Sequence, residues 1–382
     1  MKMSRHVRSR VRRRHDGTVQ RGGPALVAIL VAGFALAAPV GAVTGHSQPS
    51  SPAPRYGVGI ARCTFVDHSR AVLNYSTTPY RVSSSNRILV TEIRYPAQFR
   101  AGGPAETVGA APVPRSGGYP TVVFAHGYDV TPDTYAALLD AWVRAGFVVV
   151  APFFPDESAS AVAAQHGANT ENDLVNEPGD LAFVTSAVLR VSANETSMCP
   201  VAFGLVDPSE IALAGHSDGA EVVGMLAYDH GDDPQGVNYA SLRTGLAYRA
   251  VIILSGAEDT YQSYAAEASR PDLLVVQSRA DQCNPMGHGV LLYDAIHQPN
   301  KWFLELLTAH HLPPFDDTDA AAFGVVSATT VRFLQISLEG VTPSSSLTAL
   351  GNQRPAIARM YVGANGPSMK NVAPVKESCG PN

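Results

Sequence analysis

Six short apolar runs, separated by segments with helical periodicity, constrain the fold of this sequence most strongly. Each run holds four to seven residues that are almost free of charge, as expected for strands buried on both faces of a sheet. Strands that alternate with helices need right-handed crossovers and build a largely parallel sheet. The sequence therefore predicts an α/β fold with a mostly parallel central sheet flanked by helices. The runs cover residues 119–125, 147–151, 211–214, 250–254, 273–276 and 302–306.

The rest of the chain divides around these runs. The β-branched segments 63–66 and 87–94 predict earlier, antiparallel strands of a mixed sheet. With 382 residues and 45% hydrophobic content, the chain has material for one large domain, which we place at 56–340, ending in a helix near 319–338. Ser- and Pro-rich composition predicts a flexible linker at 43–55 and a poorly ordered tail at 341–382.

The N-terminus has the pattern of an export signal. Eight Lys and Arg residues and a single acid precede 25–43, a mostly apolar run of nineteen residues. We predict a signal peptide at 1–42, cleaved near Val43, and a secreted protein without stable membrane insertion. The alternative is an uncleaved anchor with an outward-facing domain, because about twenty apolar residues span a bilayer. The remaining chain is acidic, which argues against a nucleic-acid partner.

Four cysteines suit an exported protein, in which an even count usually forms disulfides. Three pairings are possible. One hypothesis is Cys283–Cys379, which would tether the tail, together with Cys63–Cys199. The spacing of the cysteines does not match a zinc site, so we expect no metal and no other cofactor.

The run at 211–214 leads into Gly215-His-Ser217-Asp-Gly219, a Gly-x-Ser-x-Gly pattern followed by a helical pattern. Such a serine lies on a tight turn between a strand and a helix, where glycines avoid clashes of Cβ atoms. The turn exposes the hydroxyl and directs the backbone N–H of Asp218 toward an oxyanion. We interpret Ser217 as a nucleophile.

A serine nucleophile needs a base and a group that orients the base. Asp281 follows the run at 273–276 and His311 follows the run at 302–306, so both lie where open α/β sheets carry their sites. Glu258 and Asp259, after the preceding run, are rival candidates for the acid. Gly127 lets the chain turn after the run at 119–125, so that the N–H of Tyr128 can join that of Asp218 in an oxyanion hole.

These segments resemble the α/β-hydrolase family, and within it the branch of secreted platelet-activating-factor acetylhydrolases, chlorophyllases and dienelactone hydrolases. The likeness extends over residues 59–311, and it is carried by segments 64–70, 93–97, 123–127, 145–152 and 206–217 and by Asp281 followed by Pro285. Bacterial cutinases and polyester hydrolases are similar across the same segments. They usually carry methionine where this chain has Asp218, which disfavours polyester as the substrate. A dienelactone hydrolase carries cysteine at the position of Ser217, so from that group we expect only the fold.

The resemblance implies a secreted serine carboxylic ester hydrolase with Ser217, Asp281 and His311 as its triad, acting on small or lipid-like esters without a cofactor. The ending Ala309-x-His311 also matches the cutinase-like pattern, so we choose His311 over His310 as the base. We expect a monomer. The alternatives are acyl transfer or amide hydrolysis by the same residues, or a surface binding protein on a hydrolase scaffold.

Overall fold

A computed structural model of the chain describes most residues beyond Tyr56. The predicted signal peptide at 1–42 and linker at 43–55 lie outside the described residues, as do the rival acids Glu258 and Asp259. The described residues are 56–99, 102–103, 105–166, 168, 170–194, 198–229, 237–256, 271–369 and 378–379.

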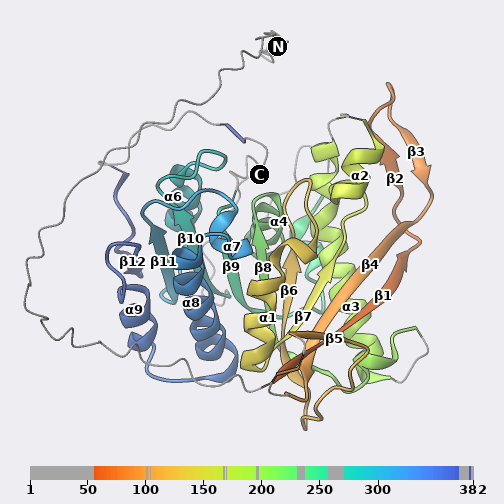
Figure 1. Cartoon of the computed structure of the whole chain (residues 1–382). Coiled ribbons are helices and arrows are strands. Elements are labelled where there is room, and N and C mark those ends of the chain that lie inside the picture. The colour runs from red at the N-terminus through yellow and green to blue at the C-terminus, as the bar shows by residue number, and fades with distance from the viewer. Residues whose placement is uncertain are drawn as a thin grey trace, which may run out of the picture. The chain divides into compact units, whose positions relative to one another are not determined.

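A ten-stranded mixed sheet forms the centre of the described fold, in the order β12-β11-β10-β9-β8-β6-β7-β4-β1-β5 (Figure 1). Neighbouring strands are parallel from β11 through β7, whereas β4 pairs antiparallel with β1 and β7, and β12 pairs antiparallel with β11. The mostly parallel sheet and its antiparallel early strands are therefore confirmed. The strands are β1 (Gly57–Asp67), β4 (Arg87–Ala97), β5 (Glu106–Val108), β6 (Tyr119–Ala125), β7 (Val148–Pro152), β8 (Val206–His216), β9 (Tyr248–Leu254), β10 (Asp272–Ser278), β11 (Lys301–Leu306) and β12 (Ala358–Val362); β2 (Val72–Asn74) and β3 (Arg81–Ser84) form a small separate sheet.

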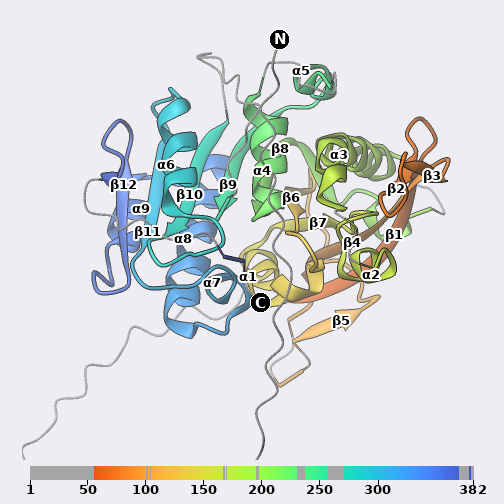
Figure 2. The ribbon, with the colours of Figure 1, turned by 90° about the horizontal axis from the view of Figure 1, so that it is seen from above.

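Helices cover both faces of the sheet (Figure 2). Side chains of α3, α4 and α6 pack on one face, and those of α1, α8 and α9 pack on the other. The helices are α1 (Ala136–Ala145), α2 (Ala159–Ala164), α3 (Glu177–Ala193), α4 (Asp218–Tyr228), α5 (Tyr239–Leu242), α6 (Met286–Ala295), α7 (Pro313–Asp316), α8 (Ala320–Glu339) and α9 (Ser345–Gly351), with 3₁₀ turns η1 (Pro132–Tyr135), η2 (Thr170–Asn176) and η3 (Pro200–Ala202).

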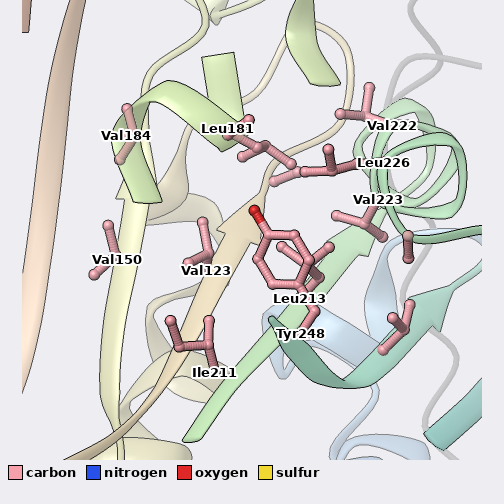
Figure 3. Close-up of a cluster of buried hydrophobic side chains, with 14 of the residues drawn as sticks. Val123, Val150, Leu181, Val184, Ile211, Leu213, Val222, Val223, Leu226 and Tyr248 are labelled. Atoms are coloured by element: carbon pink, nitrogen blue, oxygen red, sulfur yellow. The ribbon is translucent and has the colours of Figure 1, made fainter. Parts of the chain in front are cut away.

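The alternation of side chains along each strand supplies two separate cores. Val123 and Leu213 point to the face covered by α3 and α4, where they meet Leu181 and Leu226 (Figure 3). Neighbouring residues such as Phe124 point to the opposite core. Truncating a fully buried residue such as Leu213 to alanine should cost about 2–5 kcal/mol. This packing fixes the strand ends that carry the candidate site.

Helix α8 confirms the predicted helix near 319–338, and its apolar character has a simple cause. It is long and apolar enough to cross a membrane by length and composition. However, Val326, Phe333 and Leu334 are fully buried against the sheet. The helix is therefore a core element of the domain, and its composition needs no membrane.

Both hypothesised disulfides form, Cys63–Cys199 and Cys283–Cys379. The second attaches Cys379 to the loop after β10, and the backbone N–H of Ser378 donates to the carbonyl of Gln282 at 2.8 Å. The two described residues of the far C-terminus are therefore held beside the loop that contains Asp281.

The predicted irregular tail at 341–382 is wrong for its first part. Helix α9 packs against α8 and the sheet, and Leu347 is fully buried. Strand β12 then pairs antiparallel along the edge strand β11. The strand is short and half exposed, so its sequence lacks the continuous apolar run that identified the central strands.

Candidate active site

Ser217 lies at the turn between β8 and α4, the central strand and the helix that follows it (Figure 1). Its backbone has φ 56° and ψ −123°, a conformation that is uncommon for residues other than glycine. The side chain is nearly buried, with 8% exposure. Its backbone N–H donates to the carbonyl of Leu254 at 3.1 Å, which anchors the turn to β9. The strain concentrates at the predicted nucleophile, as it often does at functional sites.

The two glycines of the pattern are required by close backbone approach. A Cβ on Gly215 would lie 2.1 Å from the carbonyl oxygen of Gly219. A Cβ on Gly219 would lie 2.4 Å from the carbonyl oxygen of Ala125, at the end of β6. Both distances are far below contact distance, so the turn closes this tightly only because both side chains are absent.

Asp281 is fully buried in the loop after β10 and accepts four hydrogen bonds. Its Oδ1 accepts from the backbone N–H groups of Cys283 and Asn284, at 2.9 and 3.0 Å. Its Oδ2 accepts from Nδ1 of His311 at 2.9 Å and from Nε2 of Gln277 at 3.3 Å. These donors fix the carboxylate in one orientation, with Oδ2 facing the imidazole.

His311 lies in the loop after β11 and is 7% exposed, whereas the neighbouring His310 is exposed to solvent. The loop is tied to β10 by the hydroxyl of Ser278, which donates to the carbonyl of Ala309 at 2.6 Å. The structure thus brings His311, and not His310, against Asp281.

Ser217 and His311 line the same narrow pocket, together with Gly127 and Tyr128. Among the described atoms the two side chains form no direct hydrogen bond. The serine Oγ has two long contacts of 3.5 Å, with Oδ1 of Asp218 and Nδ2 of Asn284. In unliganded enzymes the hydrogen bonds used in catalysis are often long and tighten only around substrate.

The backbone at the predicted oxyanion hole is held by a buried histidine. Nδ1 of His126 donates to the carbonyl of Gly127 at 2.8 Å, and Nε2 accepts from the N–H of Phe154 at 3.1 Å. Burial lowers the pKa of His126 to about 4, so the ring is neutral at physiological pH. No described residue accepts a hydrogen bond from the N–H groups of Tyr128 or Asp218, which leaves both available to a ligand.

Sequence reasoning missed a second buried network beneath the site. Nδ1 of His216 lies 2.8 Å from the hydroxyl of Tyr135, which accepts from the N–H of Gly127 at 3.3 Å. Nε2 of His216 lies 3.2 Å from the carbonyl oxygen of His311. Burial lowers the pKa of His216, so it stays neutral. One side chain thus connects the β6, β8 and β11 loops, and only its position next to Ser217 could have indicated this.

An acidic side chain, Asp218, lies beside the nucleophile and interacts electrostatically with two further acids. Burial, reinforced by the charge of Glu171, raises the pKa of Asp218 to about 6. Burial and the charge of Asp218 raise the pKa of Glu157 well above its ordinary value. Glu157 is fully buried, and neither of its carboxyl oxygens has a hydrogen-bond partner.

Asn284, also unanticipated, donates to the carbonyl of Ser255 at 2.8 Å and thereby joins the Asp281 loop to β9.

Within the described ranges, His, Cys, Asp and Glu side chains do not gather in a group of three that could hold a metal ion. The acids near the start of α8 have local roles instead. Asp319 caps the helix by accepting from the N–H of Ala322 at 3.1 Å, and Asp316 accepts from the hydroxyl of Thr318 at 2.6 Å.

Comparisons with known proteins agree with this architecture. The family model described as chlorophyllase matches residues 88–254, which include β4 through β9 and the Ser217 turn. Among solved structures, a ferulic acid esterase from Streptomyces cinnamoneus superposes with a TM-score of 0.57 at 19% identity, over 78% of this chain and 96% of that chain. No curated protein matches the sequence significantly.

The sheet order, the strained serine turn and the structural match define the class: the chain has an α/β-hydrolase fold. The resemblance to the chlorophyllase branch of that family is confirmed over residues 88–254.

Proposed function

We propose that the chain is a secreted serine hydrolase that cleaves carboxylic esters through an acyl-enzyme. Ser217 attacks the ester carbonyl, His311 accepts the proton and returns it to the leaving alcohol, and Asp281 holds the imidazole in the required tautomer. Water then attacks the acyl-enzyme with His311 as base. The amides of Tyr128 and Asp218 bind the oxyanion.

The observation that carries this proposal is the Asp281–His311 pair at 2.9 Å, which opens onto the pocket of Ser217. A binding protein on the same scaffold would not need a buried carboxylate orienting an imidazole beside a strained serine. The names of the matched family and esterase support the ester as substrate. The two disulfides support an oxidising, extracellular location.

The test is hydrolysis of p-nitrophenyl esters of increasing acyl length, with phospholipid and polyester film as further substrates. Ser217→Ala should lower kcat at least about 10⁴-fold without unfolding the domain. Ser327→Ala, a matched hydroxyl deletion on α8, should leave kcat unchanged. If Ser217→Ala keeps more than a tenth of the wild-type kcat, Ser217 is not the nucleophile. Amine and alcohol acceptors added to the assay would reveal acyl transfer instead.

A further inference from the structure

The residue after the nucleophile places a carboxylate at the reaction centre. Oδ1 of Asp218 lies 3.5 Å from Oγ of Ser217, and the residue is partly exposed. Asp218 forms no ion pair with a lysine or arginine in the described part of the chain. An unpaired carboxylate at this position opposes the negative charge that develops on the attacked carbonyl oxygen, so its presence calls for a compensating role.

The segments that build the site carry no cation that could neutralise Asp218. The sequence contains no lysine or arginine in 126–143, 145–189 or 191–242. These ranges include the oxyanion loop, the connection from β7 through α2 and η2, and the whole of β8 and α4. The compensating charge is therefore not supplied by these segments.

Two arginines, one from β4 and one from the β1–β2 loop, contact residues 173–180, and both already pair with aspartates. Arg87 is fully buried between Asp173 and Asp180, with contacts of 2.6 Å to each. Arg70 pairs with Asp67 and Asp180 at 2.7 Å. Each guanidinium is thus already paired with two aspartates, so neither neutralises Asp218.

Two more carboxyls that interact electrostatically with Asp218 are buried without hydrogen-bond partners. Glu157 and Glu177 are both fully buried, and all four of their oxygens lack a partner. After burial, the charge of Asp218 contributes most to the raised pKa of Glu157, and the charge of Glu157 contributes most to that of Glu177. Burial raises the pKa of both carboxyls well above the ordinary value, and neither of them supplies a positive charge that could neutralise Asp218.

We infer that the active site favours esters that carry a positively charged organic group, an ammonium, close to the scissile bond, and that Asp218 selects for it. The inference rests on the proposed function of Ser217. The described acids do not converge as a set of three metal ligands, so a diffuse ammonium fits them better than a metal ion. Because Asp218 is negatively charged, an ester that bears an anionic group should be disfavoured.

The expected size of the preference follows from the geometry. A carbonyl in position for attack lies about 3 Å from Oγ of Ser217, so an ammonium two or three bonds away comes within about 5 Å of the Asp218 carboxylate. At an intermediate dielectric, and after the cost of desolvating the cation, the preference should be on the order of 10- to 100-fold in kcat/KM.

The experiment compares acetylcholine with 3,3-dimethylbutyl acetate, which has the same shape without the charge. We expect the wild-type ratio of kcat/KM to favour the cation at least about tenfold, and Asp218→Asn to bring the ratio close to one. Asp207→Asn is the matched control. It removes the same charge at the other end of β8, about 30 Å away, and should leave the ratio and the activity unchanged.

Each outcome decides between the two proposals. If the neutral ester is cleaved but the ratio is near one, or if Asp218→Asn does not change it, the inference is overturned and the hydrolase remains. If neither ester is cleaved and Ser217 does not react with a fluorophosphonate, the proposed function fails. If Ser217 reacts but neither ester is cleaved, calorimetric titration with tetramethylammonium chloride decides: binding that Asp218→Asn abolishes supports the inference, and no binding overturns it.

Discussion

Replacing Asp281 with asparagine should disable the site while leaving its shape intact. Oδ1 of Asp281 accepts from two backbone N–H groups, so the asparagine oxygen must occupy that position. The amide NH₂ is then forced into the position of Oδ2, where it faces Nδ1 of His311 and the donor group of Gln277. The N–H groups of His311 and Gln277, both donors, then face an NH₂ group where they had faced an acceptor.

The consequence is a change of tautomer. A donor opposite Nδ1 makes that nitrogen the acceptor and puts the proton on Nε2, which then cannot take a proton from Ser217. We expect kcat to fall on the order of 10⁴-fold, which corresponds to about 5.5 kcal/mol of transition-state stabilisation. The steric change is minimal, so the thermal unfolding transition should remain cooperative.

The assay is hydrolysis of p-nitrophenyl butyrate above neutral pH, with circular dichroism to verify the fold. Asp207→Asn serves again as the control for loss of one carboxylate. If folded Asp281→Asn keeps more than a tenth of the wild-type kcat, Asp281 does not orient the base. The rival acids Glu258 and Asp259 would then be substituted in turn.

Three further predictions address the base, the buried acids and the tether. His311→Ala should lower kcat about 10⁴-fold and the solvent-facing His310→Ala only about tenfold; the reverse ranking would show that His310 is the base. The raised pKa of Glu157 makes the folded domain keep a proton that the unfolded chain releases above about pH 4.5, so stability falls as pH rises. Glu157→Gln should therefore raise the free energy of unfolding at pH 8 by at least about 1 kcal/mol and leave it nearly unchanged at pH 4. Urea unfolding at the two pH values measures this, and an equal effect at both would contradict the prediction. Replacing Cys283 and Cys379 together with serine should lower the unfolding free energy by about 2–5 kcal/mol, and an unchanged urea midpoint would show that the tether adds no stability.

The sequence predicted the central sheet well because its strands are buried on both faces. Every residue of β6 and β7 is buried, so their apolar runs are uninterrupted. Strand β12 escaped prediction because it lies at the edge, where only alternate residues need to be apolar. Edge strands owe their place to pairing with a neighbour, which a local pattern does not reveal.

The candidate site shows the same division. Ser217, Asp281 and His311 could be located because each follows a recognisable strand, and parallel strands bring their carboxyl ends to one edge. The roles of His216 and Asn284 depend on contacts with residues far away in the sequence, which no local pattern encodes. The lack of cations around Asp218 was visible in the sequence. Its significance required knowing which segments surround the serine.

The most direct test of the central claim is reaction of the intact protein with a fluorophosphonate probe, followed by mass spectrometry of the peptides. We predict one probe per chain, attached to Ser217, with labelling abolished in Ser217→Ala and strongly slowed in His311→Ala. Failure of the folded wild-type protein to react, or attachment of the probe to another residue, would contradict the account.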